Sequence, residues 1–188
     1  LLAEQKAKED AEAKARAEAE AKAAKELTVG PSGNYKSIAE AVKAAKDGAS
    51  ITVQPGTYNE TVTVNADITI KGTAASACTL TAKNGATLTL GSNCKISGLT
   101  ISNSSSSTAP TIKINNGSPT ISNCILANST PSSAPNFVAA IEVSGGSPTI
   151  SNNQITGSKG MGITVFGGNP SISGNTITGC SIYGLWFS

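Results

Sequence analysis

The stretch IEVSGGSPTISNNQITGSKGMG, residues 141–162, is followed without a gap by ITVFGGNPSISGNTITGCSIYG, residues 163–184. The two segments are identical at 12 of 22 aligned positions. A fixed period of about 20–30 residues built from short alternating apolar runs is typical of a solenoid. Residues 22 positions apart are therefore expected to be vertical neighbours, about 4.8 Å apart, the spacing of strands in a sheet.

Earlier parts of the chain contain the same repeat with looser spacing. Thr111–Ala140 and Thr87–Pro110 are earlier coils, and Leu185–Ser188 (LWFS) begins a further one. The differences in length fall in 103–110 and 128–136, which are rich in Ser, Pro and Ala and predict surface loops. The pattern predicts an all-β right-handed parallel β-helix with three strands in each coil.

Alternation along each strand predicts which side chains point into the core. The expected core positions are aliphatic in every coil: Ile112, Ile114, Ile121, Leu126, Ile141, Val143, Ile150, Ile155, Ile163, Val165, Ile172 and Ile177. Asn153 and Asn175 share one position at a corner, where stacked amides can satisfy turn backbone groups. Cys124 occupies this position in an earlier coil and is expected to act as a small core residue.

Charge is unevenly placed along the 188 residues, of which 14% are charged. The only arginine is Arg16, histidine is absent, and Glu142 is the only acidic residue after Asp67. Because no basic cluster exists outside the first helix, nucleic acid is not an expected partner. The four cysteines form no CxxC pair, so we expect no zinc site, and nothing in the sequence indicates a cofactor. No apolar run is long enough for a membrane span.

Residues 1–26 are predicted to form a helical stalk, since 3–26 consist largely of alanine, lysine and glutamate. The segment has no Leu or Ile between Leu2 and Leu27, so a Leu/Ile coiled-coil seam is excluded. Either a solvated spacer or an alanine-faced helix that packs on a partner fits this composition. It is similar to the Ala/Lys/Glu helical spacers of bacterial envelope proteins.

Residues 27–188 are predicted to form the β-helix, with a capping helix at 37–46. Ser37-Ile-Ala-Glu40 is a capping box, and Asp47-Gly48 ends the helix. An amphipathic helix directly before a solenoid is expected to cover the apolar end of the first coil, as terminal caps do.

Three pieces of this region carry a resemblance to a known family: Gly33-Asn-Tyr-Lys-Ser-Ile38, Glu40-Ala-Val42 and Gly56-Thr-Tyr-Asn-Glu60. They resemble the opening of pectin methylesterases and related pectin-lyase-like β-helix proteins. The coils from 111 onward resemble the NxI-rich repeats of periplasmic and surface β-helix proteins. The esterases use two aspartates, an arginine and glutamine-containing motifs on later coils. This chain has no aspartate after Asp67, no arginine after Arg16 and only Gln154 among later glutamines, so we assign no catalytic residue.

One outward column on the first strand of each coil is the candidate site. It contains the only acid of the later coils, a neighbouring lysine and the only tryptophan: Thr89, Lys113, Glu142, Thr164 and Trp186. Since pectin-lyase-like proteins commonly carry their substrate groove on one outward sheet face, the resemblance implies a saccharide-binding strip. A vertical Lys–Glu pair on a polar surface is the alternative.

The function that these observations favour is a non-catalytic structural or adhesive module of a cell envelope, surface appendage or phage fibre. A polysaccharide-active enzyme with catalytic coils outside this fragment and a saccharide-binding module are the alternatives. A periplasmic, cell-surface or extracellular location is expected. We also expect the chain to continue past Ser188, or Leu185, Trp186 and Phe187 to associate with another subunit.

Overall fold

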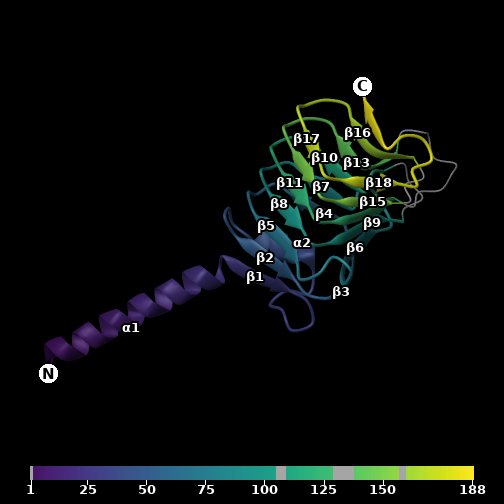
Figure 1. Cartoon of the computed structure of the whole chain (residues 1–188). Helices are drawn as coiled ribbons and strands as arrows, with labels where there is room; N and C mark the ends of the chain where they lie inside the picture. Colours follow the sequence, from purple (N-terminus) through teal and green to yellow (C-terminus); the bar gives the residue numbers. More distant parts are fainter. Residues whose placement is uncertain (1, 105–108, 129–137, 157–159) are drawn as a thin grey trace.

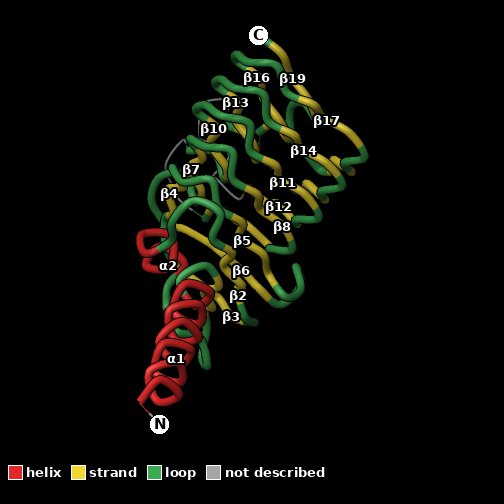
Figure 2. Tube along the Cα trace, turned by 90° about the vertical axis from the view of Figure 1, so that its left-hand side faces the viewer, coloured by secondary structure: helices red, strands yellow, loops and turns green. Residues whose placement is uncertain are grey.

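The computed structural model describes residues 2–104, 109–128, 138–156 and 160–188, which form a stalk and a three-sided solenoid (Figures 1 and 2). The three sides are the parallel sheets A, B and C, whose strands are given below. The chain passes from sheet A to sheet B to sheet C in each coil, and every described strand pairing is parallel. The parallel β-helix is therefore confirmed. The predicted loops at 103–110 and 128–136 fall mostly outside the described residues.

The strand bounds follow the three faces. Within the described residues, sheet A has seven strands: β1 (Glu26–Val29), β2 (Ser50–Val53), β5 (Thr69–Gly72), β8 (Lys95–Ser97), β11 (Thr120–Ser122), β14 (Thr149–Ser151) and β17 (Ser171–Ser173). Sheet B has six in the same part of the chain: β3 (Gly56–Asn59), β6 (Cys78–Ala82), β9 (Thr100–Asn103), β12 (Ile125–Asn128), β15 (Gln154–Thr156) and β18 (Thr176–Thr178). Sheet C likewise has six described strands: β4 (Val62–Val64), β7 (Leu88–Leu90), β10 (Ile112–Ile114), β13 (Ala139–Val143), β16 (Met161–Val165) and β19 (Leu185–Phe187).

The predicted 22-residue register is confirmed by the strand pairing. Ile141 pairs with Ile163, and Ile150 pairs with Ile172. The predicted core side chains stack along the solenoid axis, and all are buried except Ile172 and Ile177, which are half-buried in the last described coil. Because stacked aliphatic side chains lose water on both sides, this column supplies most of the hydrophobic stabilisation.

The predicted asparagine ladder lies at the corner between sheets A and B. Asn153 Nδ2 donates to Ile121 O at 2.9 Å and to Asn175 Oδ1 at 3.0 Å, while Asn153 Oδ1 accepts from Cys124 N at 3.0 Å. Asn175 Nδ2 repeats the first bond to Ile150 O at 2.8 Å. Each amide thus joins the backbone of one coil to the next, as predicted.

The helix α2 (Ile38–Ala44) covers the first coil. It is shorter than the predicted 37–46, because Ser37 is its N-cap and Ala45 has an extended backbone. Ile38 and Ala41 are buried against the core. Half of the predicted capping box is present, since Ser37 Oγ accepts from Glu40 N at 3.3 Å.

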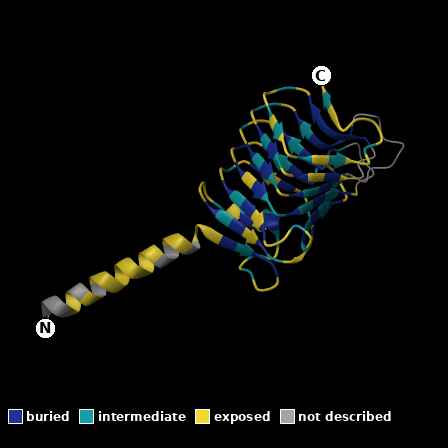
Figure 3. Cartoon of the chain, viewed as in Figure 1, coloured by how far each residue is buried: buried dark blue, intermediate teal, exposed yellow. Residues whose placement is uncertain are grey.

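The helix α1 (Leu2–Ala23) projects away from the solenoid (Figures 1 and 3). Its described side chains are exposed. The helix ends before the predicted boundary at residue 26, because Glu26 is already the first residue of β1. Neither helix of the described chain combines the length and the hydrophobicity that crossing a membrane requires.

Candidate functional site on the outer face of sheet C

The five predicted residues lie in one column across five neighbouring strands of sheet C. Lys113 pairs with Thr89 on one side and with Glu142 on the other. Thr164 follows Glu142, and Trp186 follows Thr164. The register that places these side chains together is the one that the sequence predicted. The role of this column in binding a saccharide stays a prediction.

An ion pair forms the centre of the column. Lys113 Nζ lies 3.4 Å from Glu142 Oε1, and the two side chains are 42% and 19% exposed. Ser144 Oγ donates to the same carboxylate oxygen at 3.2 Å. The carboxylate therefore has a cation and a hydroxyl beside it, in a partly desolvated position. These two contacts fix the position of the carboxylate, whose oxygens act as hydrogen-bond acceptors.

Thr164 is the buried member of the column. Its side chain belongs to the outward column but is fully buried, and its Oγ1 donates to Met161 Sδ at 3.3 Å. Val138, Ala139 and Met161 are buried as well. The outer face of sheet C is thus covered near β13 and β16, and the Thr164 hydroxyl already has a protein partner.

An aromatic pair that the sequence reading missed continues the strip. Phe166 directly follows β16, and its ring lies 5.6 Å from that of Trp186 at an interplanar angle of 71°, an edge-to-face contact. The Phe166 side chain is 46% exposed. The signal was available in the sequence, because Phe166 is two residues after Thr164 and therefore points to the same face.

Tyr183 is the third aromatic side chain at this end of sheet C. Its carbonyl accepts from Gly162 N at 2.9 Å, which places it beside the start of β16. It follows Met161 by 22 residues, and Met161 contacts the outward Thr164, so the repeat puts Tyr183 in an outward column. Tyr183 is 55% exposed. Tyr183 thus lies toward the start of β16, whereas Phe166 and Trp186 meet toward its end.

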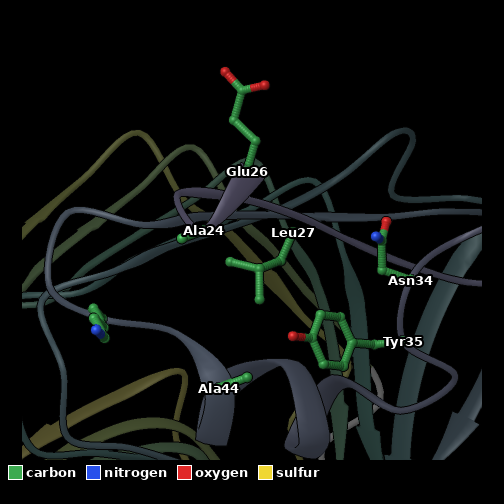
Figure 4. A pocket seen from close by; sticks show the side chains of 7 residues that line it. Ala24, Glu26, Leu27, Asn34, Tyr35 and Ala44 are labelled. Carbon is green, nitrogen blue, oxygen red and sulfur yellow. The ribbon is translucent and has the colours of Figure 1, made fainter. Parts of the chain in front are cut away.

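A separate hollow of about 180 Å³ lies at the opposite end of the solenoid (Figure 4). The side chains of Leu27 and Tyr35 face one another across it, while Glu26 points away (Figure 4). Ala24, Asn34, Ala44 and Lys46 complete the lining. It lies where the stalk meets the capping helix, so it contributes nothing to the strip on sheet C. In the described ranges, no group of three His, Cys, Asp or Glu residues could hold a metal ion.

The motif residues that resemble the methylesterases build the cap of the fold. Glu60 accepts from Ile38 N at 2.8 Å, from Ala39 N at 3.0 Å and from the hydroxyl of Ser37. Tyr58 is buried, and its hydroxyl donates to Gln54 O at 2.9 Å. Burial raises the pKa of Tyr58, with smaller contributions from Cys78 and Glu60. These contacts give the motif a structural role in this chain.

Comparison with known proteins establishes the family. The right-handed β-helix region family matches residues 46–182, so the chain belongs to this family. Among curated proteins, no relative matches the sequence significantly.

Two solved structures share the fold. The pectin methylesterase PemA from Erwinia chrysanthemi has 14% identity and a TM-score of 0.51, over 72% of this chain and 55% of its own. A mutant pectin methylesterase in complex with a hexasaccharide has 14% identity and a TM-score of 0.50, over 78% of this chain and 66% of its own. This chain thus spans between about half and two thirds of their length. At such identities the similarity shows the fold alone.

Proposed function

We propose that this chain is a non-catalytic structural or adhesive β-helix module of a cell envelope, surface appendage or phage fibre. The observation that carries the proposal is the state of Glu142, the only acidic residue after Asp67. Its carboxylate is held by Lys113 and Ser144. Acid–base chemistry on a uronide needs a second positioned group that gives or takes the proton.

The available partners for such chemistry are few. After Gly72 the sequence offers Glu142 and the four lysines Lys83, Lys95, Lys113 and Lys159 as charged residues. Lys113 is already paired with the carboxylate, and the column neighbours of the pair are threonines. The strip therefore has the chemistry of a binding or contact surface more than that of a hydrolase or lyase.

The shape of the molecule supports the same proposal. The stalk α1 projects away from the first coil, and the outer face of sheet C extends along the solenoid axis (Figures 1 and 2). A rigid solenoid on a charged helical spacer can present such a face at a distance from an anchoring point. A periplasmic, cell-surface or extracellular location is part of this proposal.

The test is an activity measurement on the purified chain. Methylesterified pectin is assayed for released methanol, and polygalacturonate for new reducing ends and for unsaturated products. We expect no turnover above the buffer rate for the chain or for Glu142→Gln. Turnover of either polymer by the purified chain would overturn the proposal, and its loss in Glu142→Gln would assign the activity to that carboxylate.

A further inference from the structure

We propose that the aromatic end of the strip, formed by Phe166 and Trp186 and flanked by Glu142, binds a neutral saccharide chain and discriminates against uronate polymers. This inference rests on the proposed adhesive function and names its ligand class. It differs from the pectin-related expectation that the resemblance implies, because galacturonan is an acidic polymer.

The ring arrangement supplies the apolar part of such a site. The edge-to-face contact with Trp186 occupies at most one face of either ring, and Phe166 keeps 46% of its surface exposed. A pyranose ring has C–H groups on its faces and hydroxyls on its rim. Binding sites for such ligands combine aromatic surfaces with a few fixed polar groups. Phe166 offers the exposed aromatic surface.

The polar part lies one strand away from Phe166 and two strands away from Trp186, with the buried Thr164 between Glu142 and Trp186. Glu142 on β13 is adjacent to β16, which Phe166 follows, and Trp186 lies on β19 on the other side of β16. The carboxylate is fixed by Lys113 and remains 19% exposed, so it can accept a hydrogen bond from a sugar hydroxyl. Carboxylates fixed in this way give orientation and specificity in addition to the contact itself.

The charge of the strip decides the class of saccharide. Lys113 and Glu142 neutralise each other, and Lys159 is the only charged side chain in residues 143–188. A polyuronate needs cations that are free to meet its carboxylates, and it would place them beside Glu142. Like charges brought together at an interface cost several kcal/mol of binding free energy. A neutral hexose or pentose polymer meets the same surface without that cost.

The experiment uses Trp186, the only tryptophan in the chain, as a reporter at the site. Intrinsic fluorescence is titrated with neutral hexasaccharides of glucose, xylose, galactose and mannose, and with hexagalacturonate, at about 20 mM and 150 mM salt. Isothermal titration calorimetry provides a readout that does not depend on Trp186. We expect saturable binding of at least one neutral series, nearly independent of salt, and weaker binding of hexagalacturonate.

The variants separate the strip from the rest of this end. Phe166→Ala is expected to weaken neutral-saccharide binding at least tenfold, and Glu142→Gln severalfold. Phe187→Ala is the matched control, because Phe187 is 59% exposed on the same strand as Trp186 but belongs to the core-facing column. It should leave binding unchanged. Thermal melts of each variant show that the fold is retained.

The outcomes distinguish this inference from the proposed function. Preferential binding of hexagalacturonate, or neutral-saccharide binding that Phe166→Ala leaves intact, would overturn the inference. Absence of any saccharide-dependent change in fluorescence and heat would also overturn it. None of these results would touch the proposed non-catalytic function, which only catalytic turnover of pectin or polygalacturonate contradicts.

Discussion

The first coil and the last coils of the solenoid are held together in different ways. At the start, the helix α2 closes the core, and contacts specific to single residues, such as those of Glu60 and Tyr58, fix the closure. From β13 onward the strand pairings recur at a 22-residue spacing, and β10 and β11 pair with the next coil in the same columns across a spacing of 29 residues, as Ile112 with Ile141. The first region is stabilised by contacts of individual side chains. The later region is stabilised by equivalent side chains that stack on one another from coil to coil.

This difference shows how a solenoid meets two separate requirements. An apolar end needs a cover of its own, whereas interior coils need only neighbours with the same register. In the described chain Leu185 and Phe187 occupy core-facing columns and are 41% and 59% exposed. Association through Leu185, Trp186 and Phe187, or through α1, stays a prediction.

The largest loss of stability is expected at a turn whose backbone lies directly against the turn of the previous coil. Gly146 has φ +81°, and an added Cβ would lie 2.1 Å from the carbonyl oxygen of Gly117 in the previous coil. Gly48, after the capping helix, has nearly the same φ of +80° but nothing within 4 Å of an added Cβ. Gly48→Ala should therefore cost about 1 kcal/mol of unfolding free energy, and Gly146→Ala about 2–4 kcal/mol.

Chemical denaturation of both variants measures this difference. Because the backbone conformations match, any excess loss in Gly146→Ala comes from the close approach of neighbouring coils. Equal losses would mean that the stacked turns can separate freely, contrary to the column description.

The next effect concerns the asparagine ladder. Asn153 is 1% exposed, and Asn153→Ala would leave Ile121 O and Cys124 N without their side-chain partner. We expect a loss of about 2–3 kcal/mol, because buried backbone groups left unsatisfied retain their desolvation cost. The neighbouring Gln154 is exposed, so Gln154→Ala should stay within about 0.5 kcal/mol.

Hydrogen exchange locates the damage in that variant. The amide of Cys124 should exchange faster in Asn153→Ala, while amides of the first coil keep their protection. Uniform acceleration along the whole solenoid would contradict a contact that acts between adjacent coils.

The columns could be predicted from the sequence because the apolar positions recur in the same order in every coil from Thr87 onward. The ungapped period places Asn153 beside Asn175, and the matching motifs on the two sides of the insertion at 128–136 place Lys113 beside Glu142. These pairings depend only on strand spacing and alternation, which are general properties of parallel sheets.

The cover of the candidate site could not be predicted in this way. Alternation gives the direction of Thr164, but it does not give the contact with Met161 or the burial of the threonine side chain on the outer face. Phe166 differs, because alternation from Thr164 already places it on the outer face, although the previous coil has Ser144 at this position. The capping carboxylate shows the same limit as Thr164, since Glu60 comes from 20 residues beyond Glu40.

A smaller effect is expected from that capping carboxylate. Glu60→Ala removes the acceptor for two backbone N–H groups in the first turn of α2, which should cost about 1–2 kcal/mol. Glu40→Ala is the control, because the contact of Glu40 with Ser37 uses its backbone N–H, which alanine keeps. Denaturation and exchange at Ile38 and Ala39 measure the change. Equal losses in the two variants would show that Glu60 does not act as the cap.

The smallest effect at neutral pH, and the sharpest test of the ladder column, concerns Cys124. Burial raises the pKa of its thiol from 9.0 to about 11, partly offset by backbone hydrogen bonds from Leu99 and Gly98. Because the folded state disfavours the thiolate, the stabilisation from a neutral thiol is complete below about pH 9. This stabilisation falls as the pH rises from about 9 through 11. At pH 10 the free energy of unfolding has fallen by about 1.4 kcal/mol. Cys124→Asn and Cys124→Ala should both remove this part of the alkaline loss, which denaturation at pH 7 and pH 10 measures.

Only Cys124→Asn supplies an amide to a position that already belongs to the ladder, so at pH 7 it should be the more stable of the two by about 1 kcal/mol. If Cys124→Ala equalled or exceeded Cys124→Asn at pH 7, Cys124 would be a packing residue alone, and the ladder would end at Asn153.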